Sequence, residues 1–438
     1  MTRQYLCIDQ RSFFATAECV ARGLDPLAAD LVVADAERSE NTICLAVSVH
    51  LKQRGVKNRC RLKEVPPWMN AIVAPPRMQF YIDMAAEIYS VFLKYLAPED
   101  IYVYSIDEAF LDVTPYLRMY GVTAEALAKR IMADVHKTVG TLCACGIGTN
   151  LYLAKIALDI LAKRSPEFLG ILDEERFREV LWDHRPLSDF WRISTGTETR
   201  LRKYGISTQR QIALCDEDFL YKLFGIDAEI LIDHAWGREP TTIADIKNYK
   251  SKSKSLFSSQ VLMRDYNVTE GELIVKEMAD QLCLDMASKH LATDSVTLYV
   301  GYSHSPGVPG VGGTAKFTRH TNLASEIVPA LAALYRRITD SRCTVRRVGL
   351  SCNHILEDTG AFQLNLFEDA ARQLRNKALQ ETLVSIRARY GKNAILKGMN
   401  YEQAATTRER NGMIGGHKSG TGTSPHAPGP AGKDILRF

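Results

Sequence analysis

Two adjacent carboxylates, Asp107 and Glu108, follow an aromatic and β-branched run at 101–104 that predicts a strand. Neighbouring side chains of a regular strand point to opposite faces, so a shared site requires a turn, which we place at 105–106. A third carboxylate, Asp9, ends an apolar run near the N-terminus. Mg²⁺ takes oxygen ligands from carboxylates and substrate phosphates. The three acids therefore predict a two-metal site for phosphoryl transfer, whereas an Asp-Glu pair alone would be typical of a solvated hairpin end.

The segment after Asp9 could serve a nucleotide. Ser12 is expected to cap a helix that carries Phe13 and Phe14, and these two rings could lie beside the metal or simply in the core. A short helical segment at 50–54 follows and ends at a glycine. Lysine and arginine suit phosphate oxygens, although the same charges would also suit a solvated face. The basic residues concentrated here are Lys52, Arg54, Lys57, Arg59, Arg61 and Lys63.

Composition limits the classes of protein to which this chain can belong. Its 438 residues suit about three domains, and 46% of them are hydrophobic. No apolar run reaches about 18 residues, so we expect neither a transmembrane helix nor a membrane partner, and residues 1–4 are unlike a signal peptide. Scattered cysteines without zinc spacing predict a reducing, cytoplasmic setting. A net charge of +4 is weak evidence for nucleic acid.

The elements around the acids predict an α+β domain. Helices are expected at 78–95 and 122–139, then a small-residue strand at 142–148 and a helix at 150–163. This order fits a ferredoxin-like fold with one long insertion.

Two further regions differ in character. Short aromatic-rich helices follow from about residue 170, and 192–206 resembles a helix-hairpin-helix, which lays backbone N–H groups on DNA phosphates. Ser194 stands where such hairpins usually carry glycine, so a small helical core is an equally good account. After a lysine-rich linker, 254–355 predicts a second domain with the order β-α-β-β-α-β. A helix is expected at 370–390, and the glycine-rich residues 403–438 show no apolar period, which predicts disorder.

Three blocks of this sequence resemble the Y-family (translesion) DNA polymerases, somewhat nearer the UmuC-like branch than polymerase IV. The blocks are 8–15, 104–112 and 146–163, and their order and spacing agree with the family. The resemblance implies an α+β multidomain right hand with a ferredoxin-like palm, small fingers, a helical thumb and an α+β little finger. The implied boundaries are 1–11 and 80–168 for the palm, 12–79 for the fingers, 169–240 for the thumb, 241–253 for a linker, 254–355 for the little finger, 362–368 for a clamp-binding peptide and 369–438 for a C-terminal helix and disordered tail.

The resemblance also assigns roles to residues at matching positions. Asp9, Asp107 and Glu108 would be catalytic and would hold two Mg²⁺ ions, with Mn²⁺ as a possible substitute. The carbonyl of Gln10 would be a further ligand. The other matches are Phe14 as the steric gate against a 2′-hydroxyl, Phe13 beneath the incoming nucleotide, and Lys52 and Lys163 on its phosphates.

Three positions depart from the family pattern. Arg11 replaces an acidic residue that is common beside the site. Val49 falls where many members have a phosphate-binding tyrosine, and Ala46 where a hydroxyl is common. The triphosphate would therefore be held with fewer hydroxyl contacts.

The partners implied by the resemblance are primer-template DNA, dNTPs and the bacterial sliding clamp. It also implies low-fidelity bypass of damaged DNA in repair and the SOS response, and it leaves open whether RecA or another activating subunit is needed. No second acidic cluster suggests a proofreading exonuclease. The DNA-binding candidates are Lys250, Lys252, Lys254, Lys316, Arg346 and Arg347. The clamp-binding candidates are Gln363, Leu364, Leu366 and Phe367, which could instead pack on the helix that follows.

Two other functions fit part of this pattern. A nucleotide cyclase also places paired carboxylates and two metals on a ferredoxin-like palm, but the separate basic domain and the Phe13-Phe14 pair argue against it. A non-catalytic scaffold for DNA and clamp is the second alternative, and the presence of all three carboxylates argues against it.

Overall fold

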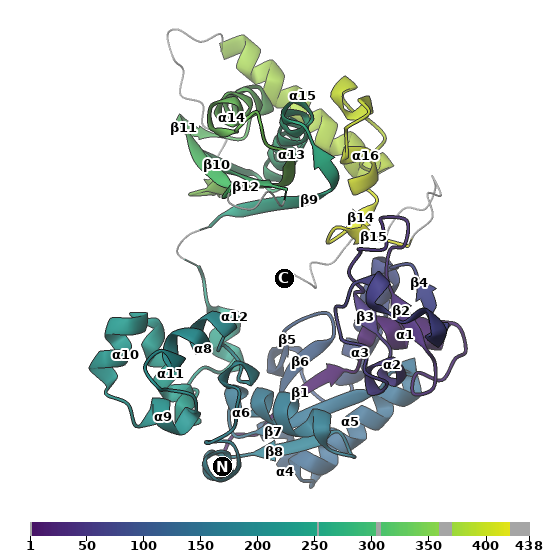
Figure 1. Ribbon diagram of the computed structural model, residues 1–438, viewed down its shortest axis with the longest axis vertical. Coiled ribbons are helices and arrows are strands. Elements are labelled where there is room, and N and C mark those ends of the chain that lie inside the picture. Colours follow the sequence, from purple (N-terminus) through teal and green to yellow (C-terminus); the bar gives the residue numbers. More distant parts are fainter. Residues whose placement is uncertain (1, 252–253, 304–307, 359–369, 421–438) are drawn as a thin grey trace. The chain divides into compact units, whose positions relative to one another are not determined.

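The computed structural model describes residues 2–251, 254–303, 308–358 and 370–420 (Figure 1). These residues form two compact units, one built on Met1–Tyr249 and the other on Lys250–Ser419, and each is described by itself. Within those ranges, no helix combines the length and the apolar character that a membrane span requires.

The first unit is organised by a five-stranded sheet in the order β5-β6-β1-β7-β8. The central strand β1 pairs antiparallel with β6 and with β7, and the edge strand β8 runs parallel to β7. This mixed sheet with helices on both faces confirms the predicted α+β class. The strands are β1 (Tyr5–Gln10), β5 (Ile101–Val103), β6 (Glu108–Asp112), β7 (Cys143–Gly148) and β8 (Leu169–Leu172).

Alternation along β1 divides the core of this unit between the two faces of the sheet. Leu6 and Ile8 belong to a cluster that includes the apolar faces of α3 (Met78–Phe92) and α5 (Ala124–Val139). Tyr5 and Cys7, on the other face, pack with the helix that follows β7. The positions of α3 and α5 agree with the predicted periodic segments, and Thr123 caps α5 by accepting a bond from the amide of Ala126.

The helix after β7 lies unusually close to the sheet. It starts as α6 (Leu151–Ile156), widens into a π-helical turn, η4 (Ala157–Leu161), and ends in a 3₁₀ turn, η5 (Ala162–Arg164). A Cβ atom added at Gly146 would lie 2.1 Å from the carbonyl oxygen of Ala154, and one added at Gly148 would lie 2.2 Å from the Ala154 amide nitrogen. Only glycine permits this approach, so the small-residue strand fixes the distance between the helix and the sheet.

The insertion between β1 and α3 forms a small subdomain around a three-stranded sheet in the order β3-β2-β4. Its first helix, α1, does not begin as predicted: Ser12 has φ 50° and its side chain makes no capping bond. Strand β3 is only two residues long, and Ile43, which precedes it, forms an isolated bridge with Arg61. The elements are α1 (Phe13–Ala21), β2 (Leu31–Val33), β3 (Ala46–Val47), α2 (Val49–Gln53), η1 (Leu62–Glu64), η2 (Pro67–Met69) and β4 (Ile72–Ala74).

Short helices follow β8 and share an aromatic and aliphatic core that includes Phe177, Phe190 and Leu201. Ser194 acts as an N-cap here, since its hydroxyl accepts a bond from the amide of Thr197 at 3.1 Å. That role accounts for serine at a position where a helix-hairpin-helix would carry glycine. The helices are α7 (Glu174–Val180), α8 (Thr195–Arg202), α9 (Gln209–Ala213), α10 (Glu217–Phe224), α11 (Asp227–Ala235) and α12 (Ile243–Asn248).

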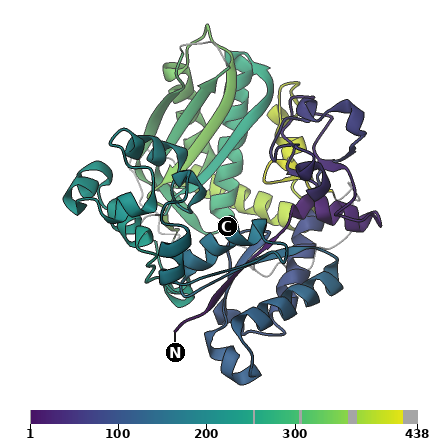
Figure 2. The ribbon, with the colours of Figure 1, turned by 60° about the horizontal axis from the view of Figure 1, so that its bottom comes forward.

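The second unit has the predicted order β-α-β-β-α-β. Its antiparallel sheet runs β11-β10-β12-β9, and α13 and α14 contribute their apolar sides to a single core with it (Figure 2). Residues on the opposite side of the sheet are exposed, including Phe257, Val261 and Tyr299. The elements are β9 (Leu256–Tyr266), α13 (Val268–Ser288), β10 (Leu291–Tyr302), β11 (Val311–Thr321), α14 (Ala324–Ile338), β12 (Val345–Asn353) and β13 (Leu356–Glu357).

The C-terminal segment is folded as far as Gly420. The prediction that disorder begins at residue 403 is therefore wrong for residues 403–420. After the predicted helix, α15 (Ala370–Tyr390), the chain forms a turn, a short helix and a hairpin. Polar contacts hold it to α13: the buried carboxylate of Glu277 accepts bonds from the Asn400 side chain and the Thr406 amide, both at 2.8 Å. Because polar contacts produce no apolar period in the sequence, the sequence pattern predicted disorder for a segment that is folded. The elements are η7 (Gly398–Tyr401), α16 (Thr407–Arg410), β14 (Met413–Ile414) and β15 (His417–Lys418).

Candidate active site

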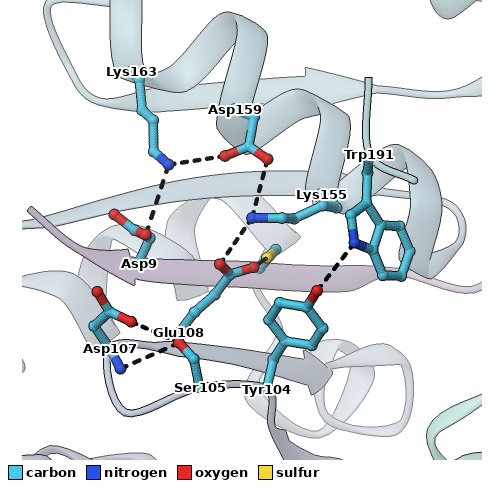
Figure 3. Close-up of polar contacts among 10 residues, drawn as sticks. Asp9, Tyr104, Ser105, Asp107, Glu108, Lys155, Asp159, Lys163 and Trp191 are labelled. Carbon is cyan, nitrogen blue, oxygen red and sulfur yellow. Dashed lines mark hydrogen bonds and ion pairs between the residues drawn. The ribbon is translucent and has the colours of Figure 1, made fainter. Parts of the chain in front are cut away.

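The predicted turn brings two of the three carboxylates to one end of the sheet (Figure 3). The amides of Tyr104 and Ser105 donate to the carbonyl of Glu108 at 2.9 and 3.0 Å, which closes the hairpin between β5 and β6. Glu108 is then the first residue of β6 and lies directly opposite Asp9 of β1. Side chains of a directly opposed antiparallel pair share a face of the sheet. Asp9 and Glu108 therefore point to the face that the α6 helix covers.

Glu108 is compensated by a buried lysine. The Lys155 ammonium lies 2.8 Å from Glu108 Oε2, and both side chains are less than a tenth exposed, at 9% and 8%. The Cys7 thiol donates to the other carboxylate oxygen of Glu108 at 3.1 Å. Lys155 also lies 5.8 Å from the ring of Tyr104, whose hydroxyl accepts a bond from the Trp191 indole at 3.1 Å. Lys155 is not among the predicted site residues, although it falls within the block 146–163 that resembles the family.

The Asp9 side chain is 17% exposed, and its cationic partner lies farther away than that of Glu108. Its nearest ion-pair partner is Lys163, whose ammonium lies 3.6 Å from Asp9 Oδ2 and 2.8 Å from Asp159 Oδ1. Burial raises the pKa of Asp9 to about 7, Lys163 opposes this shift, and the neighbouring charges of Asp107 and Glu108 add to it. A carboxylate held in this way is a favourable place for an added cation, because the cation would supply the missing charge.

Asp107 lies in the turn itself and is held locally. The Ser105 hydroxyl donates to Asp107 Oδ1 at 2.6 Å, and the Asp107 carbonyl accepts from the amide of Gln10 at 2.8 Å. In the part of the chain that the structure describes, no three Asp, Glu, His or Cys side chains are arranged to hold a metal. Each carboxylate points to a protein partner instead, so the predicted metal set of Asp9, Gln10, Asp107 and Glu108 stays a prediction.

The donor set nevertheless fits a hard divalent cation. Carboxylate oxygens from Asp9 and Glu108 stand on neighbouring strand ends, and the Asp107 turn adjoins both. The side chain of Gln10 is not available, because its oxygen accepts from Thr141 at 2.8 Å. The backbone carbonyl of Gln10 remains the predicted ligand.

In addition to Lys163, the cationic side chains of Lys52 and Arg11 are close enough to Asp9 to interact with its charge. Burial lowers the pKa of Lys52, Asp9 opposes this shift, and Lys163 and Arg11 contribute to it. Lys52 of α2 is therefore close to these charged groups, as its predicted phosphate role requires. The Arg11 guanidinium stacks 3.6 Å above the Phe168 ring, where burial lowers its pKa.

The adjacent aromatic residues Phe13 and Phe14 have different environments. Phe13 is 2% exposed and belongs to the core, so the core interpretation holds for this ring. Phe14 is only partly buried and stacks on Tyr81 with ring centroids 4.5 Å apart. Of the two rings, Phe14 is the one that a ligand could contact.

The basic candidates of the second unit are distributed over its linker and sheet. Lys250, Lys254, Lys316 and Arg347 are exposed, whereas Arg346 pairs with Asp265 at 3.3 Å. Lys252 and the four clamp-binding candidates, Gln363, Leu364, Leu366 and Phe367, lie outside the described residues.

Comparisons with known proteins agree on one family. The family model for the impB/mucB/samB family matches residues 8–159, and the model for its C-terminal domain matches 253–366. UvrX, a Bacillus subtilis (strain 168) protein named for UV-damage repair, is 30% identical over 95% of this chain and 98% of its own length. DNA polymerase IV 2 of the same organism is 28% identical over 94% of this chain and 97% of its own length.

A solved structure has the same fold. The Y-family DNA polymerase chimera Dbh-Dpo4(243-245)-Dbh superimposes with a TM-score of 0.63 at 21% identity. The match covers 81% of this chain and 99% of the chimera.

Replacing Asp9 by asparagine is expected to stabilise the metal-free protein at pH 8. The folded protein retains a proton that the unfolded chain loses near its ordinary pKa of 3.8, so ionisation of Asp9 destabilises the fold increasingly up to about pH 7. Thermal melts in EDTA should give Asp9→Asn a Tm that exceeds the parent's by more at pH 8 than at pH 5.

The matched control is a carboxylate whose pKa is shifted in the opposite direction from that of Asp9. A hydrogen bond from Lys94 lowers the pKa of the partly exposed Asp134 on α5, so Asp134→Asn should not raise Tm. An Asp9→Asn protein that melts at or below the parent's Tm at pH 8 would contradict the burial of an uncompensated charge.

Proposed function

The chain belongs to the impB/mucB/samB family of Y-family translesion DNA polymerases and is a DNA-directed DNA polymerase, and we propose that Asp9, Asp107 and Glu108 hold two divalent ions at its catalytic centre. The observation that supports this assignment is the pair Asp9–Glu108, two carboxylates opposed on neighbouring strand ends, of which Glu108 is buried and Asp9 is 17% exposed. Mg²⁺, or Mn²⁺ in its place, is the cation that an all-oxygen set of this kind favours.

The family chemistry requires few reacting groups from the protein. When bound, the two ions would favour ionisation of the primer 3′-hydroxyl and stabilise the pyrophosphate that leaves. The contribution of this chain is to position charge. Asp9 stays short of a cation, while Lys155 keeps Glu108 from being an uncompensated buried charge until the site is occupied.

The incoming dNTP would lie between the first sheet and the small subdomain. Lys163 and Lys52 would bind its phosphates, since both are close to Asp9 and neither is locked into a buried ion pair. Phe14 would lie under the sugar as the steric gate, and the core residue Phe13 would support it. Val49 is buried at the start of α2, so this helix offers no phenolic hydroxyl to the phosphates at that position.

The second unit would contact primer-template DNA through its exposed sheet. The strand register puts Arg347 opposite Val261, and Lys316 stands two residues from Thr314, which bonds Thr297 across β10 and β11. Lys316 and Arg347 therefore share the open face with Phe257 and Tyr299. Lys250 and Lys254 would add phosphate contacts from the linker, and Lys252 is proposed with them.

The two alternative functions are less well supported. The matches over 95% of the chain to UvrX and 94% to DNA polymerase IV 2 favour a polymerase over a nucleotide cyclase. A scaffold without catalysis would have no need to hold Asp9 and Glu108 largely out of solvent at a cost in stability. Low fidelity, the absence of proofreading, and action in the SOS response with or without RecA or another activating subunit belong to the proposal as family properties.

Asp107→Ala is expected to abolish template-directed primer extension and to leave primer-template binding largely intact. The carboxylate serves the metal site, whereas lysine and arginine elsewhere supply affinity for the DNA phosphates. Extension assays and fluorescence anisotropy on the same preparation separate the two properties. Parent-like extension by the purified variant would remove Asp107 from the catalytic centre.

Phe14→Ala is expected to admit ribonucleotides. The ratio of dNTP to rNTP insertion rates should fall by roughly tenfold or more, because exclusion here is a steric contact. Tyr81→Phe is the matched control, since it keeps the stacked ring and removes only the hydroxyl that bonds Glu18. An unchanged ratio in Phe14→Ala would show that another residue is the gate.

The peptide from Gln363 to Phe367 is proposed to bind the bacterial sliding clamp. Burial of Leu364, Leu366 and Phe367 in an apolar groove would contribute about 1.5–3 kcal/mol for each side chain before ordering costs, and tethering would raise the local concentration at the primer end. The double variant Leu366→Ala/Phe367→Ala should lose clamp-stimulated extension and keep clamp-free synthesis. If the double variant loses clamp-free activity and also has a lower Tm, these side chains belong to the hydrophobic core instead.

A further inference from the structure

Asp159 lies between the two lysines of the catalytic centre and contacts both of them (Figure 3). Its Oδ2 atom is 3.0 Å from the Lys155 ammonium, and its Oδ1 atom is 2.8 Å from the Lys163 ammonium. Lys155 in turn bonds Glu108, and Lys163 stands 3.6 Å from Asp9. The five side chains form a row of alternating charge that starts and ends at a predicted metal ligand.

The spacing along the helix lets Asp159 contact both lysines, because it lies four residues from each of them, and a π-helical turn lies within the same run. In a regular α-helix, residues eight apart in sequence differ by about 80° around the axis, so Lys155 and Lys163 would point in different directions. The run from Ala157 to Leu161 is a π turn, in which more residues complete each turn. The three side chains at 155, 159 and 163 therefore come nearer to one line, and Asp159 stands within the turn itself.

Asp159 also has the exposure expected of a group that exchanges partners. Its side chain is 26% exposed and that of Lys163 is 40%, whereas Lys155 and Glu108 are almost fully buried. The Asp159–Lys163 contact can therefore open to an incoming phosphate at modest cost, while the Lys155–Glu108 contact cannot. The Lys155–Glu108 end of the row is therefore fixed, whereas Lys163 at the other end can leave Asp159.

We infer that Asp159 is a positioning residue that restrains Lys163 from closing on Asp9, and so keeps Asp9 open to a divalent cation and Lys163 open to the triphosphate. This inference rests on the proposed two-metal function. Without the Asp159 carboxylate, Lys163 would have a single anionic neighbour, Asp9, and a direct pair between them would compete with the cation. Asp159 touches neither metal nor nucleotide in this account, and acts only through the two lysines.

The test measures binding without chemistry. Parent and Asp159→Asn proteins are bound to primer-template DNA with a dideoxy-terminated primer, and binding of the correct dNTP is followed by the fluorescence of a 2-aminopurine in the template while Mn²⁺ is titrated. The Mn²⁺ midpoint should rise by about five- to tenfold in Asp159→Asn, as expected for loss of one partly exposed charge-assisted hydrogen bond. Asp159→Glu restores the charge and should recover most of the midpoint.

Two further measurements keep the inference falsifiable. Asp134→Asn removes a carboxylate that bonds Lys94 at 3.2 Å on α5, and its midpoint should equal the parent's. A lower Tm in Asp159→Asn with an unchanged Mn²⁺ midpoint would overturn the inference and leave Asp159 as a helix contact only. If the parent itself shows no Mn²⁺-dependent dNTP binding, the metal assignment fails first, and Asp107→Ala extension assays report that failure independently.

Discussion

The structure around the proposed catalytic centre depends on keeping two carboxylates largely out of solvent at the ends of neighbouring strands. Asp9 and Glu108 stand opposite each other on β1 and β6, in surroundings that raise the pKa of Asp9 to about 7. Burial of such charges is costly unless each has a cation nearby. Glu108 has Lys155 at 2.8 Å, whereas the ammonium of Lys163, the ion-pair partner of Asp9, lies 3.6 Å away. This asymmetry leaves one carboxylate satisfied by the protein and one that an added cation would satisfy.

The lysines can reach the sheet only because their helix lies against it. Gly146 and Gly148 leave room for the backbone of Ala154, which no side chain at either position would allow. Asp159, four residues from each lysine on this helix, then contacts both Lys155 and Lys163. The small residues of β7, the position of the helix and the arrangement of its charged side chains thus depend on one another. A change in any of them would alter the distances between the charged groups at the site.

The buried carboxylate of Glu277 is stabilised by contacts that serve only the fold. Glu277 of α13 is 2% exposed and accepts bonds from Asn400 and Thr406, which are neutral donors of the C-terminal segment. No lysine takes part in these bonds, and the donors belong to a segment that closes over the helix. Neutral donors bond Glu277, whereas lysines are the ion-pair partners of Asp9 and Glu108.

The sequence by itself determined the elements and the location of the acids. Apolar periodicity marked α3 and α5, the second domain has the predicted order β-α-β-β-α-β, and the turn before Glu108 follows from the strand run that precedes it. Tertiary structure alone decided the rest. The partner of Glu108 is 47 positions away, the left-handed conformation of Ser12 replaces its expected cap, and residues 391–420 fold through polar bonds to α13. Periodicity and propensity are local properties of a chain, but the partner of a buried charge is chosen by which segments the fold brings together.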